Sequence, residues 1–188
     1  MDAASSALQR VDTIVLQFEI PIHTVYYTVE FARTHGIRCI VNPAPALKVN
    51  LQELSAADYF MPNETEAEVI SGLPVRTMED VKKCAAALLQ YGFGRVVITL
   101  GARGSLLATP QHTELIEPFP VTPVDTTGAG DAFIGSFAVY LGAGLSEKEA
   151  LTRASLYAAL STMRVGTQKS LPTRAEFEAE WLKRGRNN

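Results

Sequence analysis

The segment Arg95-Val-Val-Ile-Thr-Leu100, followed directly by Gly101-Ala-Arg-Gly104, is the most strand-like part of the chain. Its residues are β-branched and apolar on both faces, which is typical of a central strand in a parallel sheet. Outward from it, strand patterns alternate with helical patterns toward the N-terminus, and helical patterns dominate toward the C-terminus. This order predicts an α/β fold, with three layers (α/β/α) built on a mostly parallel sheet.

The boundaries of the predicted elements follow from the same periodicities and from helix start and stop signals. Glycines end several helical patterns, and Ser146 and Thr173 each precede a glutamate by three residues, which indicates capping boxes. The segments 105–108 and 114–117 are predicted to form a hairpin of two edge strands. The other predicted strands are 11–18, 37–41, 57–61 and 95–100, and the predicted helices are 22–35, 65–71, 79–91, 127–141, 146–163 and 173–184.

The composition predicts an ordinary globular protein with one domain over residues 1–188. Hydrophobic residues make up 47% of the chain, charged residues 20%, and the net charge is −3. The longest basic cluster is Lys183-Arg-Gly-Arg186, which gives nucleic acid little to bind. No apolar run reaches the ~18 residues of a membrane span, and no signal peptide is recognisable. We therefore expect a cytosolic protein with two buried thiols, Cys39 and Cys84.

The segment Asp125-Thr-Thr-Gly-Ala-Gly-Asp131 concentrates the chemistry. The small residues Gly128, Ala129 and Gly130 leave the backbone bare where a helix begins, so that amide N–H groups and the helix dipole point at one place. Such a site suits an anion, including a phosphoryl group in transfer. Asp131, in the first helical turn, is then placed to accept a proton from an attacking hydroxyl. The alternative is an ordinary glycine-rich turn with Asp131 as a helix-start residue.

Several further segments, in the same order along the chain, make the sequence resemble the ribokinase branch of the PfkB carbohydrate kinase family between residues 11 and 172. The resemblance implies ATP-dependent phosphorylation of D-ribose at the 5-hydroxyl, with Mg²⁺ and a monovalent cation, usually K⁺, as cofactors. The small-molecule partners it implies are ATP and ribose or a similar sugar. The matching segments are Asn42-Pro-Ala-Pro-Ala46, Pro62-Asn-Glu-Thr-Glu-Ala-Glu68, Thr99-Leu-Gly-Ala-Arg-Gly104, Asp125-Thr-Thr-Gly-Ala-Gly-Asp131 and Arg164-Val-Gly-Thr-Gln-Lys-Ser170.

The resemblance implies a metal and phosphate role for Asn63 and Glu66. Mg²⁺ keeps several waters and needs only one or two protein oxygens nearby, so an amide and a carboxylate are sufficient. Read without the resemblance, Asn63 is a helix N-cap and the glutamate simply suits the first turn. The resemblance also assigns Glu19 to the sugar, although a solvated loop glutamate is an equal alternative.

Nucleotide contacts are expected where the central strand ends, because ligands of open α/β sheets bind at the carboxyl ends of strands. The glycines there allow close approach of the backbone, although they also suit a tight turn. The resemblance places Ser155 at the adenine pocket, where a small helical residue can equally serve packing. The expected nucleotide-binding residues are Asn63, Thr99, Gly101, Ala102, Arg103, Gly104, Gly130 and Ser155.

A monovalent cation site beside the anion-binding turn is implied by the resemblance alone. Its expected role is to hold that turn in shape, with several ligands acting through backbone carbonyls. On the residues by themselves, Asp125 can equally be a turn aspartate. The implied K⁺ site comprises Asp125, Thr127, Ser161, Arg164, Gly166 and Ser170.

The family pattern begins before this chain does. The Gly-Gly motif, most sugar contacts and the small lid through which the family often forms homodimers are not found in the sequence. We therefore expect a fragment, a mis-predicted gene product or a shortened form, with weak or no activity on its own. Alternatives are a related kinase for a nucleoside or another sugar, and a non-catalytic nucleotide-binding remnant. A dinucleotide-dependent dehydrogenase is disfavoured, because no Gly-x-Gly-x-x-Gly follows the first strand.

Overall fold

The structure, a computed structural model, describes residues 4–184. The chain forms two compact units. Unit 1 comprises Met1–Leu100 and Leu106–Leu115, and unit 2 comprises Gly101–Ser105 and Ile116–Asn188. The organisation of residues 1–188 as a single domain stays a prediction.

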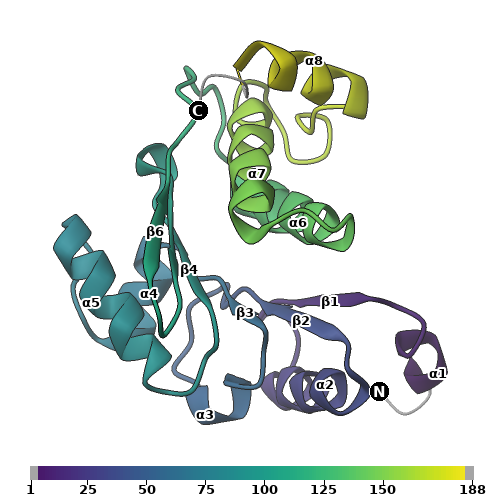
Figure 1. Ribbon diagram of the computed structural model, residues 1–188, viewed down its shortest axis with the longest axis vertical. Coiled ribbons are helices and arrows are strands. Elements are labelled where there is room, and N and C mark those ends of the chain that lie inside the picture. Colours follow the sequence, from purple (N-terminus) through teal and green to yellow (C-terminus); the bar gives the residue numbers. More distant parts are fainter. Residues whose placement is uncertain (1–3, 185–188) are drawn as a thin grey trace. The chain divides into compact units, whose positions relative to one another are not determined.

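A six-stranded sheet forms the centre of unit 1 (Figure 1), with its strands in sequence order from β1 to β6. The first four strands are parallel, and the interior position predicted for the 95–100 strand is confirmed. Of the predicted hairpin, only the second strand lies at an edge, since β5 is flanked by β4 and β6. The strands are β1 (Thr13–Leu16), β2 (Arg38–Val41), β3 (Tyr59–Phe60), β4 (Val96–Thr99), β5 (Ser105–Ala108) and β6 (Thr113–Ile116).

Three amphipathic helices of unit 1 were predicted and two short ones were not. The predicted ones are α2 (Ile22–His35), α4 (Glu64–Ser71) and α5 (Met78–Leu89), and the others are α1 (Ser5–Leu8) and α3 (Leu51–Leu54). A helix of a single turn shows no 3.6-residue periodicity, so only a capping residue could have predicted it from the sequence. For α3 that cap is Asn50, whose side chain accepts a hydrogen bond from the Gln52 amide.

The core of unit 1 lies between the parallel strands and the helices that contact them. Helix α2 contacts β2, and α5 contacts β4 (Figure 1). Val96, Val97 and Ile98 of β4 are completely buried, which is why the strand reads as apolar on both faces. Cys39 and Cys84 are buried free thiols, as predicted. Burial, together with the nearby Asp58 charge, raises the pKa of Cys39 to about 12.

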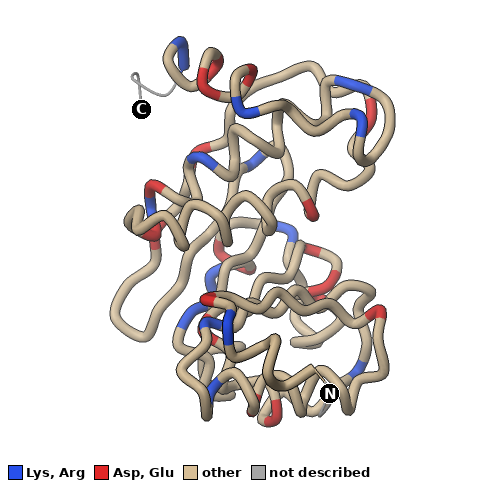
Figure 2. The backbone as a smooth tube through the Cα atoms, turned by 90° about the vertical axis from the view of Figure 1, so that its right-hand side faces the viewer, with Lys and Arg blue, Asp and Glu red and all other residues tan. Residues whose placement is uncertain are grey.

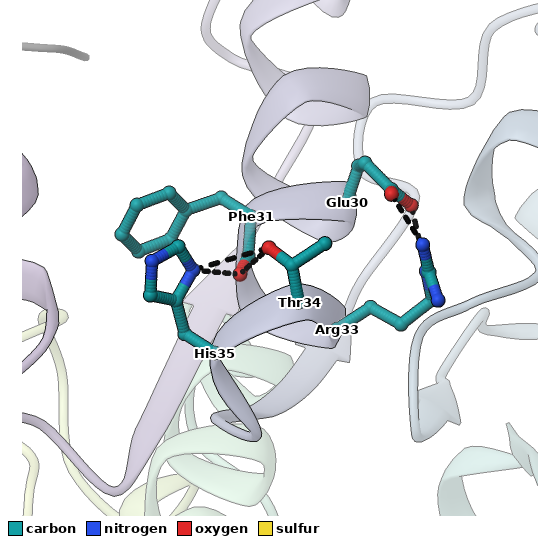
Figure 3. Close-up of polar contacts among 5 residues, drawn as sticks. All are labelled: Glu30, Phe31, Arg33, Thr34 and His35. Atoms are coloured by element: carbon teal, nitrogen blue, oxygen red, sulfur yellow. Dashed lines mark hydrogen bonds and ion pairs between the residues drawn. The ribbon is translucent and has the colours of Figure 1, made fainter.

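Helix α2 ends at its predicted residue, His35, and Figure 3 shows the side-chain contacts in its last turns. The Phe31 carbonyl, one of the last in the helix, accepts a hydrogen bond from the Thr34 hydroxyl at 2.9 Å. His35 Nδ1 lies 2.8 Å from the same oxygen, and the His35 ring stacks on the Phe31 ring at 4.0 Å. The helix itself ends at Gly36, a left-handed C-cap whose amide donates to the Ala32 and Arg33 carbonyls.

Unit 2 is mainly helical. Helix α6 (Ala129–Gly142) packs along α7 (Glu147–Ser161), and α8 (Arg174–Arg184) contacts α7. A small cluster of Phe119, Leu156 and Phe177 is buried among them, with Trp181 packed against it. The capping residues predicted for the last two helices are in place. Ser146 accepts from the Glu149 amide, and the Glu176 carboxylate accepts from the Thr173 amide at 2.7 Å.

Charged residues of both signs are interspersed along each unit (Figure 2). Within residues 4–184, no helix combines the length and the apolar character that crossing a membrane requires. The absence of nucleic acid and membrane partners remains a prediction.

Candidate active site

The N-terminus of α6 is built by the predicted glycine-rich turn. Gly128 is the N-cap and adopts a left-handed conformation (φ 77°), which glycine alone adopts at little cost. Asp131 lies in the first turn of the helix and is exposed to solvent rather than turned into the core. One predicted donor is engaged, since the Ala129 amide donates to the Thr126 carbonyl at 3.2 Å. The amide of Gly130 belongs to the first turn, where no carbonyl of the same helix can accept it.

An open cavity of about 900 Å³ in unit 2 begins at this turn. Gly128 and Asp131 line it, together with Ala132, Gly135 and Ser136 from the same face of α6. Small side chains on this face leave the space unfilled. The predicted anion-binding turn and the predicted base therefore both face a volume that can admit a small molecule.

Asp125 fastens the loop that precedes α6 to the loop that follows α7. Its Oδ1 accepts the Thr127 amide at 3.0 Å, and its Oδ2 accepts the Gly166 amide at 3.0 Å. These donors, from Gly166 first and then Thr127, lower the pKa of Asp125 to about 2. Thr167, next to Gly166, lies over Gly128, with its Cγ2 3.5 Å from where a Gly128 Cβ would stand. The two loops are thus held together beside the anion-binding turn.

Of the predicted K⁺ residues, Asp125 contacts Thr127 and Gly166 directly. The other three lie at the end of α7 or in the loop that follows it. The Ser161 hydroxyl donates to the Ala158 carbonyl, and the Ser170 hydroxyl donates to the Thr167 carbonyl. The Arg164 guanidinium pairs with Glu176 of α8 at 2.5 Å, so only its carbonyl is available to a cation. One carboxylate among loop carbonyls suits a large, weakly hydrated cation, and the K⁺ assignment stays a prediction.

In unit 1, Asn63 and Glu66 form a complete capping box at the start of α4. The Asn63 side chain accepts the Glu66 amide at 2.8 Å, and Glu66 Oε2 accepts the Asn63 amide at 2.8 Å. A third bond runs from Asn63 Nδ2 to Glu66 Oε1 at 2.8 Å. Asn63 is exposed, whereas Glu66 is only 7% exposed. The bland interpretation of Asn63 as an N-cap is therefore correct, and it is compatible with the predicted metal role.

Sequence reasoning gave no role to Asn42, which the structure places against Glu66. Asn42 Nδ2 donates to Glu66 Oε2 at 3.3 Å and to the Met61 carbonyl at 2.9 Å. Burial raises the pKa of Glu66, and the donors from the Asn63 backbone and the Asn42 amide oppose that rise. The sequence did offer one signal for Asn42: it is a polar residue directly after the apolar strand β2, at the carboxyl ends of the strands, where ligands bind.

Of the predicted nucleotide residues, Thr99 at the end of β4 lies next to this cluster. Thr99 is bridged to Asn63, and its amide donates to the Pro62 carbonyl at 3.0 Å. Gly101–Arg103 then form a 3₁₀ turn, which includes Ala102. Gly104 must be glycine, because its φ is 86° and a Cβ would stand 2.0 Å from the Ile116 carbonyl oxygen.

The predicted adenine contact, Ser155, is buried, whereas the predicted sugar contact, Glu19, is exposed. Ser155 on α7 is buried, and its hydroxyl has no partner within residues 4–184. An orphaned hydroxyl of this kind fits a polar ligand group, as the predicted adenine pocket requires. Glu19 is exposed in the loop after β1, which the Phe18 amide ties to the Ala44 carbonyl at 2.8 Å. Its sugar contact stays a prediction.

The sequence and fold match one family. The pfkB family carbohydrate kinase pattern covers residues 1–174, and the chain belongs to this family. It is 39% identical over 178 residues to a deoxyribokinase of Salmonella typhi, covering 94% of this chain and 58% of that protein. It is 38% identical to ribokinase of Bacillus subtilis, covering 93% of this chain and 57% of that protein. The chain thus spans somewhat more than half the length of these curated relatives.

Solved structures confirm the predicted fold class. The Arabidopsis thaliana ribokinase complexed with ribose and ATP aligns with a TM-score of 0.90 at 28% identity, covering 95% of this chain and 58% of that one. Ribokinase from Thermotoga maritima aligns with a TM-score of 0.84 at 38% identity, covering 95% and 59%. The predicted resemblance to the ribokinase branch is therefore confirmed, while the choice of sugar is not.

The donor set around Glu66 fits Mg²⁺. Among residues 4–184 no group of three His, Cys, Asp or Glu side chains could enclose an ion. A single buried carboxylate beside an exposed amide instead suits a cation that keeps most of its waters and binds phosphate oxygens. Asn63 and Glu66 are the residues that would hold its water shell.

Proposed function

We propose that the chain is the nucleotide-binding and catalytic portion of an ATP-dependent sugar kinase that phosphorylates the 5-hydroxyl of D-ribose. Family membership supports a phosphotransferase acting on a carbohydrate. The Arabidopsis thaliana relative holds ribose and ATP together, which supports the choice of both substrates. Asp131 is the base, and the turn of Gly128, Ala129 and Gly130 is the anion-binding site.

The observation that carries the proposal is the start of α6. Its left-handed Gly128 and exposed Asp131 both line the same cavity, so an anion at the helix N-terminus and a hydroxyl beside the carboxylate fit together. In the reaction, the sugar oxygen bonds to the γ-phosphorus while its proton passes to Asp131. The bond between the γ-phosphorus and the bridging oxygen breaks, and ADP leaves with the electron pair.

The other residues act by holding groups in place. Glu66 and Asn63 orient the water shell of Mg²⁺, which when bound neutralises charge on the transferring phosphate. Asp125 ties the 164–170 loop to the turn before α6, a link that a bound K⁺ would strengthen. Thr99, the turn Gly101–Gly104 and Ser155 contact the nucleotide, and Glu19 contacts the sugar.

A second acceptor is supported by one observation. The Salmonella typhi relative, at 39% identity, is a deoxyribokinase. Ribose and 2-deoxyribose differ only in the 2-hydroxyl. A site that hydrogen-bonds the 2-hydroxyl strongly rejects 2-deoxyribose, whereas an apolar site at that position rejects ribose only weakly. Transfer of labelled phosphate from ATP to ribose, 2-deoxyribose and adenosine, compared in parallel, ranks the acceptors.

The test of the mechanism is the Asp131→Asn variant. Because the chain spans about 57% of Bacillus subtilis ribokinase, it is measured both alone and joined to the uncovered portion of that relative. In the joined protein we expect turnover to fall about 10²- to 10⁴-fold while ATP still binds, since only proton acceptance is lost. Ser136→Ala, on the same cavity wall, is the control and should keep its turnover.

Two results would contradict the proposal. Near-normal turnover of Asp131→Asn would remove Asp131 as the base. ATP binding without any sugar phosphorylation in the joined protein would favour a nucleotide-binding remnant. Ribose-dependent ADP release by the chain alone is expected to be weak or absent, and turnover matching the joined protein would refute that expectation.

A further inference from the structure

A relay of side-chain amides joins the ends of three parallel strands to Glu66. Gln17 follows β1, Asn42 follows β2, and Met61 follows β3. Gln17 Nε2 donates to Asn42 Oδ1 at 3.2 Å, and the Asn42 amide donates in turn to the Met61 carbonyl and to Glu66 Oε2, at 2.9 and 3.3 Å. The backbone hydrogen bonds between the strands continue beside this relay, because the backbone amide of Asn42 donates to the Leu16 carbonyl at 2.9 Å.

The orientation of the Asn42 side chain follows from its partners. Its Nδ2 faces two acceptors, the Met61 carbonyl and Glu66 Oε2, while its Oδ1 faces the Gln17 donor. Turning the amide over would place oxygen against two oxygens and nitrogen against nitrogen, so only one orientation is stable. Asn42 is also 7% exposed, so water does not offer replacement partners readily.

The relay fixes Glu66 from a second side. The capping box with Asn63 holds both carboxylate oxygens from the helix, within one local turn of chain. Asn42 holds Oε2 from the sheet, 24 residues away in sequence. A carboxylate gripped from helix and sheet cannot rotate, and its remaining lone pairs point in fixed directions. Capping the helix does not require the additional hydrogen bond from Asn42 to Glu66.

We propose that Asn42 is a positioning residue for the metal and phosphate site, holding the Glu66 carboxylate in place, with Gln17 supporting Asn42 in turn. This rests on the proposed function, in which Glu66 orients the Mg²⁺ shell. Asn42 itself touches neither metal nor nucleotide and acts through Glu66. Outer partners of metal-binding groups typically alter metal affinity by about 10- to 100-fold when they are removed.

The experiment measures the affinity of the purified chain for ATP by calorimetry, with and without Mg²⁺. The ratio of the two affinities is the metal-linked gain. For Asn42→Asp, which keeps the size and the acceptor for Gln17 but sets an oxygen against Glu66, we expect the gain to fall ~10- to 100-fold. Gln17→Met should lower it less, and metal-free ATP affinity should hardly change in either variant.

The matched control is Ser71→Ala at the other end of α4. Its hydroxyl bonds the Ala67 carbonyl and the Leu73 amide, so the variant weakens the helix without touching Glu66. Thermal unfolding of each variant separates loss of fold from loss of metal linkage. If Asn42→Asp and Gln17→Met lower the metal-linked gain no more than Ser71→Ala does, Asn42 is only structural and the inference fails.

Glu66→Gln separates this inference from the function on which it rests. If Glu66→Gln abolishes the metal-linked gain while the Asn42 and Gln17 variants keep it, the proposed function stands and the positioning role is overturned. If Glu66→Gln keeps the gain, the proposed metal site itself is wrong. Both the proposed function and the positioning role are supported if Glu66→Gln abolishes the metal-linked gain, Asn42→Asp lowers it strongly and Gln17→Met lowers it less.

Discussion

At the scale of single residues, Asp125 shows how one carboxylate can organise a site without being buried. It accepts two backbone amides, one from its own turn and one from a loop 41 residues away. These amides favour the charged carboxylate, which is why the pKa is lowered to about 2 from an ordinary 3.8. The same interaction that would help to shape a cation site therefore also links folding to pH.

The Asp125→Asn variant tests this link. A carboxyl whose pKa is lowered by folding stabilises the native state above its unfolded pKa of 3.8 and loses that contribution as the pH falls toward about 2. We expect the wild-type chain to be more stable than the variant at neutral pH, with the difference shrinking between these two values. Urea unfolding at a series of pH values measures it, and a constant difference across that window would contradict the assignment.

The sequence identified residues that lie in local motifs but missed those that act across the fold. The place of Gly128 and Asp131 at a helix start could be predicted, because a glycine-rich turn and its aspartate are neighbours in the chain; their roles stay a prediction. The contact of Asn42 with Glu66 depends on which strands lie side by side, and no local pattern carries that information. The engagement of the Ala129 amide by Thr126 also went unpredicted, because it depends on the exact fold of the turn.

At the scale of elements, long amphipathic helices were predicted closely and short strands less so. Helix α2 has both predicted ends, because Gly36 closes it in a left-handed conformation. Strand β3 was predicted over 57–61 but covers only Tyr59–Phe60. The reason lies in Asp58, whose carboxylate accepts the Cys39 amide at 2.7 Å in place of a backbone carbonyl. A side chain thus replaces one backbone acceptor at the start of β3, although the Asp58 amide still donates to the Cys39 carbonyl at 2.9 Å.

The anchoring of α8 gives a prediction at this scale. Phe177 is 2% exposed and packs between Tyr140 and Tyr157, whereas Leu182 on the same helix is 58% exposed. We expect Phe177→Ala to lower the free energy of unfolding by about 3–5 kcal/mol, because it removes a buried ring and leaves a cavity. Leu182→Ala is the control and should change it by less than about 0.5 kcal/mol. Chemical denaturation of both variants compares them.

At the scale of the whole molecule, the sheet has one parallel edge with no partner among the described residues. β1 pairs only with β2 there, and Val15 on β1 is 43% exposed. The family and the three-layer fold could be predicted because they rest on many segments in order. The acceptor could not, because the chain spans only 58% of its deoxyribokinase relative and about as much of its ribokinase relatives.

The open edge predicts self-association of the chain at high concentration, since unpaired strand edges readily pair with one another. Val15→Lys should shift sedimentation velocity profiles toward the monomer by placing a charge on that strand. Val69→Lys is a matched control, because Val69 is similarly exposed, at 44%, but lies on helix α4. Monomeric wild-type protein, or an equal effect of both variants, would contradict the prediction.

The aromatic stack on α8 has a practical consequence. Trp181 is the single tryptophan of the sequence, and the Arg153 guanidinium lies over its ring at 4.5 Å, with the Phe177 ring stacked beside it. Its emission wavelength and intensity therefore report only on the surroundings of Trp181 in unit 2. Fluorescence of this indole, read beside the circular dichroism of the whole chain, can reveal whether the helical half melts separately from the sheet.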